Sequence, residues 1–226
     1  MKDKKLVIYG VGETAEIIAD YFMHDSDYQV VAFTVDSEFK KVDELMGLPV
    51  ISTDELAAKY PSSEHFLFAA ASFGKLNTSR QKMYEKGKSW GYRFASYVSS
   101  KAFFWHNATI GENSFVFENN VIQYKVQIGN NVILWSGNHI GHQTIIEDHC
   151  FISSHVVISG FCTIGRNSFL GVNSSFNDEI KFGRYGVTGN GTIIVKNTEE
   201  GGIYVGNPAK MIKSSYEVFG VTPEEQ

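Results

Sequence analysis

The sequence predicts a protein of two parts: a small α/β domain of the Rossmann type in residues 1–97, then a parallel β-helix in residues 98–198 with a closing segment in residues 199–226. The first observation is a six-residue repeat, in which a large apolar residue recurs at every sixth position from Val98 to Ile194 with a single exception. A strict period of six belongs neither to an α-helix nor to plain strand alternation, and it is typical of a solenoid of short strands. The second observation is that strand patterns alternate with helical patterns before residue 98, as in an α/β domain.

The first α/β unit begins with KKLVIYGVGETAEIIADYF, which predicts a buried strand, a glycine turn and an amphipathic helix. Gly10 and Gly12 in this turn precede the helix N-terminus, which is a ready site for an anion. The next strand, YQVVAFTVD, ends on Asp36, an acid suited to a ribose hydroxyl or a base edge. Because Ala15 occupies the third glycine position of the dinucleotide fingerprint and the domain is short, we expect it to bind one nucleotide rather than NAD.

The remaining elements of the first half belong to the same class of fold. STDELAAKY predicts a helix that begins with a capping box at Ser52 and Glu55. HFLFAAA predicts an apolar strand, and Asn77 to Lys86 predicts a further helix. The segment FASYV is expected to close the sheet.

In the second half, the repeat predicts which residues lie on top of one another. Three hexads make one triangular coil of 18 residues, so residues 18 apart stack on successive coils. His142 is therefore expected to stack on Gly160. The Gly160 amide has no side chain to shield it and could donate to a carbonyl oxygen that becomes an oxyanion. His142 beside it could act as a general base, because imidazole accepts protons near neutral pH.

Three other histidines are close in sequence but differ in position within their hexads. His155 falls in a column that we expect to adjoin that of His142 and to line the same groove. His139 is a candidate partner that supports His142, or an ordinary surface side chain. His149 falls in the column of a different corner and is expected to be a solvated turn residue.

The composition excludes several classes of protein. With 43% apolar residues, 20% charged residues and a net charge of −5, the chain is not basic enough to suggest nucleic-acid binding. The apolar run after the basic start is interrupted by glycine and followed by Glu13, so we expect neither a signal peptide nor a membrane span, and a cytoplasmic location. Cys150 and Cys162 fit no zinc spacing and are expected to be buried thiols, with no bound metal.

The segment IGHQTIIEDHCFISSHVVISGFCTIGRNSFLGVNSSF, followed by GNGTIIVKN and GGIYVGNPAKMIK, resembles the hexapeptide-repeat sugar acyltransferases. This family includes sialic acid O-acetyltransferases and N-acetyltransferases of nucleotide-linked amino sugars. The resemblance implies a left-handed parallel β-helix, a homotrimer with active sites at the subunit interfaces, and acetyl-CoA as the acyl donor. His142 falls at the position of the family's catalytic histidine, and Gly160 at the glycine whose amide contacts the thioester carbonyl.

One position departs from the family pattern. Members that act on bacillosamine-type sugars have an acidic residue directly after the histidine, where this chain has Gln143. A carboxylate there would orient the imidazole and stabilise its protonated form, whereas a glutamine can only orient it. Either another acid takes this role, with Glu147, Asp148 and Asp178 as candidates, or the base is weaker.

The resemblance also implies two sets of binding residues. The pantetheine arm of the cofactor would run past three glycines, and a lysine of GNPAK would meet a cofactor phosphate: Gly171, Gly189, Gly191 and Lys210. The N-terminal module would hold the nucleotide of the sugar, with its pyrophosphate or base contacted by Lys75, Asn77 and Arg80. For Lys210 and Arg80, the alternative of an ordinary surface residue stays open.

These observations favour transfer of an acetyl group from acetyl-CoA to the amino group of a nucleotide-linked sugar, such as a UDP- or dTDP-4-amino-4,6-dideoxyhexose, for bacterial surface glycans. N-acylation is favoured over O-acetylation of a sugar or sialic acid because an amine is the stronger nucleophile and tolerates a weaker base. A metal hydratase related to the γ-class carbonic anhydrases is a further alternative. His106 and His142 lie two coils apart, but Glu147 stands where a third histidine is expected. The last alternative is a protein that binds nucleotide sugars without catalysis.

Overall fold

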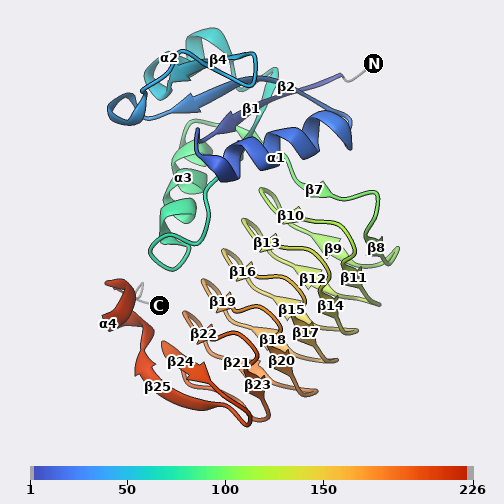
Figure 1. Cartoon of the computed structure of the whole chain (residues 1–226). Helices are drawn as coiled ribbons and strands as arrows, with labels where there is room; N and C mark the ends of the chain where they lie inside the picture. Colours follow the sequence, from blue (N-terminus) through green and yellow to red (C-terminus); the bar gives the residue numbers. More distant parts are fainter. Residues whose placement is uncertain (1–2, 223–226) are drawn as a thin grey trace.

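The computed structural model describes residues 3–222 and has two parts, an α/β domain and a β-helix that lies against one side of it (Figure 1). The α/β domain contains a six-stranded sheet in the order β3-β4-β2-β1-β5-β6, parallel except for the β3–β4 hairpin. Its elements are β1 Lys4–Tyr9, α1 Glu13–His24, β2 Tyr28–Val35, a 3₁₀ turn Ser37–Phe39, β3 Glu44–Leu45, β4 Leu48–Ser52, α2 Thr53–Lys59, β5 His65–Ala69, α3 Thr78–Ser89 and β6 Arg93–Phe94.

The predicted strands and helices of this domain are confirmed, including the capping box at Ser52 and Glu55. The strands β1, β2 and β5 are apolar runs because they are central in a parallel sheet and buried on both faces. One expectation was wrong in part. Of the predicted segment FASYV, only Phe94 joins this sheet, as part of β6, whereas Tyr97–Val98 pairs with Phe115–Val116 and belongs to the β-helix.

The second part has the predicted left-handed β-helix fold, with three parallel sheets of two-residue strands. The first face contains β7 Tyr97–Val98, β10 Phe115–Val116, β13 Ile133–Leu134, β16 Phe151–Ile152, β19 Phe169–Leu170 and β22 Val187–Thr188. The second face contains β8 Phe103–Phe104, β11 Val121–Ile122, β14 His139–Ile140, β17 Val157–Ile158, β20 Ser175–Phe176 and β23 Ile193–Ile194. The third face contains β9 Thr109–Ile110, β12 Gln127–Ile128, β15 Ile145–Ile146, β18 Thr163–Ile164 and β21 Lys181–Phe182.

Every pairing in these faces joins residues 18 apart, as the repeat predicts. In the second face, for example, His139 pairs with Val121 on one side and with Val157 on the other. The large residue of each hexad points into the prism and forms its core, which also holds the predicted buried thiols Cys150 and Cys162. Burial raises the pKa of Cys150 to about 12, so this thiol is not a nucleophile. The last elements are β24 Gly202–Val205, β25 Lys210–Ser214 and α4 Ser215–Phe219.

Three corners join the faces and recur in every coil. We call them the first corner (between first and second faces, such as residues 135–138), the second corner (second to third, such as 141–144) and the third corner (third to first, such as 147–150). Many of these turns contain a residue in the left-handed region, where asparagine and glycine are favoured. The second corner instead has four larger side chains in this conformation: Lys125, Gln143, Phe161 and Glu179.

The α/β domain covers the first face and the third corner, so those parts of the β-helix are buried. Outward side chains of the first face, such as Phe115 and Phe151, share one apolar core with Phe22 of α1 and Phe68 of β5. Figure 1 shows α1 and α3 on this side of the coils. The second face, the second corner and the third face remain on the side away from the domain. Within residues 3–222, no helix is long and apolar enough to cross a membrane.

Candidate functional site

The second corner brings together the two residues that the repeat predicts to stack. His142 lies in the turn after β14 and is exposed. Its ring lies directly over the Cα of Gly160 on the next coil, since a Cβ atom added to Gly160 would come within 2.6 Å of His142 Cε1 and 2.9 Å of Nε2. Glycine at 160 therefore makes room for the imidazole, and any side chain there would displace it.

The Gly160 amide, however, is already engaged. It donates a hydrogen bond to Asp178 Oδ1 at 2.9 Å, one coil further on, and the amide of Phe161 donates to the carbonyl oxygen of His142 at 2.9 Å. The expectation of an unshielded Gly160 amide ready for a carbonyl oxygen is therefore wrong for this state of the protein. Asp178 would have to release the amide before it could bind an oxyanion.

The imidazole of His142 is held by packing. The ring of Phe161 meets it edge to face, with centroids 5.0 Å apart and planes at 86°. Gln123 Oε1 accepts a hydrogen bond from the backbone amide of His142 at 3.0 Å, which fixes the turn rather than the ring. Gln143 is exposed with a φ of 60°, and its amide donates to the carbonyl of Tyr124. Within residues 3–222, no side chain forms a hydrogen bond with a ring nitrogen of His142.

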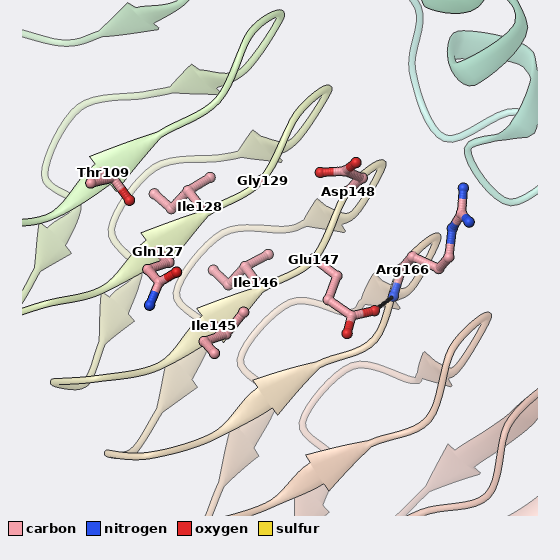
Figure 2. Close-up of a pocket in the computed structure, with 9 residues that line it drawn as sticks. All are labelled: Thr109, Gln127, Ile128, Gly129, Ile145, Ile146, Glu147, Asp148 and Arg166. Atoms are coloured by element: carbon pink, nitrogen blue, oxygen red, sulfur yellow. Dashed lines mark hydrogen bonds between the residues drawn. The ribbon is translucent and has the colours of Figure 1, made fainter.

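Two of the acids considered as a partner for His142 lie elsewhere, at the third corner. Glu147 accepts a hydrogen bond from the backbone amide of Arg166 at 2.9 Å, and Asp148 accepts one from the amide of Asn130 at 2.6 Å. Figure 2 shows the first of these bonds beside a cleft of about 420 Å³ on the third face, where Thr109 also contributes to the lining. His142 does not line this cleft, so neither acid replaces the carboxylate missing at Gln143.

The other histidines occupy other positions on the prism. His155 lies at the first corner over Gly137, where an added Cβ would come within 2.6 Å of its Cε1 and Nδ1. Within one chain, the expectation that His155 lines the same groove as His142 is wrong because their turns lie at different corners. His139 lies on the second face in β14, partly exposed between Val121 and Val157.

The glycines expected along the cofactor also lie at the first corner, on the same side as His155 rather than His142. Gly171 follows β19 and its amide donates to Thr188 Oγ1 at 2.9 Å, while Gly189 donates to the carbonyl of Tyr204. Gly191 has a φ of +67° and is exposed, so its turn requires a residue without a side-chain penalty. Lys210 is exposed at the start of β25.

The glycine turn of the α/β domain lies where the ends of β1 and β5 come close together. Gly10 has a φ of +137°, and a Cβ there would lie 2.5 Å from the carbonyl oxygen of Ala70. Gly12 caps α1 and is exposed, but Glu13 and Glu16 occupy the first turn of that helix, which weakens its attraction for an anion.

Asp36 lies at the end of β2 as expected, within reach of three donors. Its Oδ1 accepts hydrogen bonds from Tyr9 Oη at 2.7 Å, Thr53 Oγ1 at 3.0 Å and Lys86 Nζ at 2.8 Å. Burial raises the pKa of Asp36, but these bonds outweigh it and the pKa is lowered overall. Asp36 is thus a charged acid whose Oδ1 already has protein partners.

The three residues expected to contact the nucleotide from the loop before α3 have different positions. Lys75 is exposed. Asn77 is buried and donates to the carbonyls of Asn167 and Ser168 at 3.2 and 3.1 Å. Arg80 is fully buried, with its guanidinium directed at the third corner. The expectation that Asn77 and Arg80 meet a nucleotide is therefore wrong, because both bind the β-helix instead.

The guanidinium of Arg80 donates to oxygen atoms of two coils. Its Nε donates to Asn131 Oδ1 at 3.1 Å, and its Nη2 donates to the carbonyls of Asn131, His149 and Cys150 at 3.2, 3.3 and 3.2 Å. Burial lowers the pKa of Arg80 to about 9. His149 itself is buried, with Nδ1 2.9 Å from Nδ2 of Asn131, so the expectation of a solvated turn residue is wrong.

Phe161 is the residue of this site that sequence reasoning did not single out, and it could have been found because it directly follows Gly160. Asp178 was one of the candidate acids; it lies one coil after Gly160 and accepts the amide of that glycine. In residues 3–222, no group of three or more His, Cys, Asp or Glu side chains is placed to hold a metal ion. The chemistry available at this corner is that of an exposed imidazole on a glycine, with an amide and a carboxylate beneath it.

The repeat matches a known family model. Residues 107–142 and 125–160 match the model of the bacterial transferase hexapeptide (six repeats). This match lies within the β-helix and confirms the hexapeptide repeat predicted from the sequence.

Solved structures agree over nearly the whole chain. The acetyltransferase domain of PglB from Neisseria gonorrhoeae is 22% identical, covers 92% of this chain and 100% of its own, and has a TM-score of 0.81. PerB from Caulobacter crescentus, in complex with CoA and GDP-perosamine, is 21% identical with 92% and 97% coverage and a TM-score of 0.82. WeeI from Acinetobacter baumannii is 19% identical with 92% and 100% coverage and a TM-score of 0.78. At these identities the likeness establishes the fold of both parts.

Proposed function

We propose that the protein transfers an acetyl group from acetyl-CoA to the amino group of a nucleotide-linked amino-deoxy sugar, with His142 as general base. The observation that carries this proposal is the exposed imidazole seated on Gly160 at the second corner. Similar structures support the substrate classes. The PglB domain has been solved with acetyl coenzyme A, and PerB with CoA and GDP-perosamine.

In the proposed reaction, the amino nitrogen of the sugar attacks the thioester carbonyl while His142 accepts a proton from it. The new N–C bond forms as the carbonyl becomes a tetrahedral oxyanion. The C–S bond then breaks, and the proton held by His142 passes to the departing CoA sulfur. A positioned base of this kind contributes typically about 10² to 10⁴ in rate, and no covalent intermediate on the protein is required.

The surroundings of His142 favour an amine over a hydroxyl acceptor. The carboxylate that would stabilise a protonated imidazole is absent from position 143, and Glu147 and Asp148 bond to amides of the third corner. The third candidate acid, Asp178, accepts the amide of Gly160 rather than a hydrogen bond from the imidazole. An amine is already a strong nucleophile and loses its proton as the bond to carbon forms, whereas a hydroxyl needs stronger activation. We therefore place O-acetylation second.

A homotrimer is part of the same proposal. His142 lies at the second corner, whereas the glycines proposed to line the cofactor arm, Gly171, Gly189 and Gly191, lie at the first corner. A neighbouring copy that presents its first corner to the second corner of this chain would join these two sets in one site. In the α/β domain, Gly12, Asp36 and Lys75 remain the candidates for the nucleotide.

The test is a thiol-release assay with acetyl-CoA and a panel of UDP-, dTDP- and GDP-linked amino sugars, with products analysed by mass spectrometry and NMR. We expect turnover with one or more of these sugars and an N-acetyl product. If the product is acetylated on a hydroxyl group, the acceptor is an alcohol and the enzyme is an O-acetyltransferase. Tight binding of a nucleotide sugar without any release of thiol would instead indicate a binding protein.

A further inference from the structure

Phe161 occupies a position that neither the turn nor the core explains. Its φ is +57°, in the left-handed region that a bulky aromatic residue adopts only at a cost in strain. The residue is 49% exposed, so burial in the core does not compensate for this strain. Tyr185 has the same backbone conformation, with a φ of +54°, but it is buried in an apolar cluster with Leu76 and Val187.

The contact made by Phe161 is with His142. The two rings meet edge to face, with centroids 5.0 Å apart and an interplanar angle of 86°. Beneath the imidazole, Gly160 lies so close that an added Cβ would come within 3.0 Å of Cε1, Nε2 and Nδ1. The imidazole therefore rests on Gly160, with the Phe161 ring against it.

The orientation of His142 depends on this packing. Histidines that act as bases are usually fixed by a hydrogen bond from one ring nitrogen to a carboxylate or a carbonyl. In the part of the chain that the structure describes, no such bond reaches His142, and Gln143 occupies the position of the acid. Two contacts remain that restrict rotation of the imidazole. One is with the ring of Phe161, and the other is with the backbone of Gly160.

We propose that Phe161 is a positioning residue, whose ring holds the imidazole of His142 in its reactive orientation in place of a hydrogen-bonded carboxylate. This inference rests on the proposed function, because it gives the orientation of His142 a purpose. It explains why a strained aromatic residue stands where asparagine would relax the turn. It also explains how an imidazole that is not hydrogen-bonded to a carboxylate is kept in one orientation.

The test uses substitutions that separate the ring from the turn. Phe161→Asn relaxes the backbone and removes the ring, whereas Phe161→Tyr keeps both ring and strain. We expect Phe161→Asn to lower kcat by about tenfold, since loss of reactive geometry is expensive in rate, with little change in the KM for acetyl-CoA and an unfolding temperature that is unchanged or higher. Phe161→Tyr should retain kcat within about threefold, because the edge-to-face contact remains.

Rescue provides a stricter test. Adding Gln143→Glu to Phe161→Asn places a carboxylate at the position after His142, and this double variant should recover most of the lost kcat. Glu179→Ala is the matched control, because Glu179 occupies the same turn position one coil further on, with a φ of +63° and an exposed side chain. Its kcat should equal that of the unchanged protein.

Two outcomes would overturn the inference. An unchanged kcat in Phe161→Asn would show that the ring is dispensable. A raised KM for acetyl-CoA with an unchanged kcat would show that Phe161 contacts acetyl-CoA instead. A readout independent of turnover is the NMR signal of the His142 Cε1 proton, which the ring of Phe161 shifts. If the Phe161→Asn variant leaves this signal unmoved, the contact does not exist in solution. Absence of turnover in the unchanged protein would instead contradict the proposed function and leave the NMR result to decide on the contact.

Discussion

The second and third corners of the β-helix have turns of the same geometry in opposite surroundings. Gln143 at the second corner has a φ of 60°, and His149 at the third corner has a φ of 65°. At the third corner, carbonyl groups accept hydrogen bonds from the buried Arg80, and His149 itself is buried beside Asn131. At the second corner, His142 is exposed and its ring nitrogens have no such partners in residues 3–222.

This difference shows that the backbone of the repeat does not decide which corner is available for catalysis. The winding places a histidine in a turn at each of the three corners, and the α/β domain covers one of them. A covered histidine becomes part of a hydrogen-bonded interface, where its ring is not available to a substrate. An exposed one can accept a proton from a bound molecule. Which corner is covered depends on long-range packing, so the roles of these residues follow from tertiary structure.

The largest expected effect separates His142 from His155. Each imidazole lies over a glycine one coil away, His142 over Gly160 and His155 over Gly137. We expect His142→Ala to lower kcat by about 100-fold or more, the contribution of a positioned general base. His155→Ala removes the same kind of stack from the first corner, which the proposed trimer places along the cofactor arm. It should therefore change the KM for acetyl-CoA, while kcat stays within about threefold.

Both variants are measured by thiol release under saturating substrates, with circular dichroism as the check on folding. Equal losses in the two variants would mean that the stacks are structural. Unchanged turnover in His142→Ala would remove this residue from the mechanism.

The second expected effect concerns the stability of the covered corner. Arg80→Met removes the donor to the carbonyls of Asn131, His149 and Cys150 and leaves them buried without it. Since a buried unsatisfied polar group costs about 1–3 kcal/mol, we expect the free energy of unfolding to fall by about 3 kcal/mol or more. Urea unfolding followed by tryptophan fluorescence measures this change.

Lys82→Met, on the exposed side of the same helix, is the control and should change the free energy of unfolding by less than about 0.5 kcal/mol. A similarly small change in Arg80→Met would show that the carbonyls find other partners. In that case the α/β domain would depend on its apolar contacts with the first face alone.

The sequence predicted the winding well because the repeat is a local property. A large residue every sixth position determines which side chains point inward, and residues 18 apart then pair as observed for His139 and Val157. The stacking of His142 on Gly160 followed from that arithmetic. The sequence could not show that Arg80 is buried, because a single arginine at a helix start looks the same whether it faces solvent or a second domain. Nor could it show that the Gly160 amide is bonded to Asp178, because that depends on a side-chain rotamer.

The third expected effect concerns that amide. Asp178 Oδ1 accepts its hydrogen bond at 2.9 Å and so competes with a thioester carbonyl for the same donor. We expect Asp178→Ala to lower the KM for acetyl-CoA by about fivefold, which corresponds to the net value of one hydrogen bond of about 1 kcal/mol. Asp148→Ala is the matched control, because Asp148 accepts the amide of Asn130 one coil away at the third corner. The KM of Asp148→Ala for acetyl-CoA should be unchanged. A raised KM in Asp178→Ala would show that the carboxylate helps the Gly160 amide to bind the thioester carbonyl.

The smallest expected effect depends on pH and lies where the first coils meet α1. Asp25 ends that helix and accepts hydrogen bonds from Tyr97 Oη at 2.5 Å and from the backbone amide of Ser100 at 2.8 Å, and the bond from Tyr97 in particular lowers its pKa to about 2. Because the folded pKa lies below the unfolded value of about 3.9, this carboxylate stabilises the fold above pH 4, and the contribution is lost as the pH falls toward 2. We therefore expect Asp25→Asn to be less stable than the unchanged protein by about 1 kcal/mol at pH 7 and equally stable near pH 2.

Urea unfolding at several pH values measures the difference, with the exposed Asp27→Asn as control. A difference that stays constant between pH 7 and pH 2 would show that Asp25 acts through its shape rather than its charge.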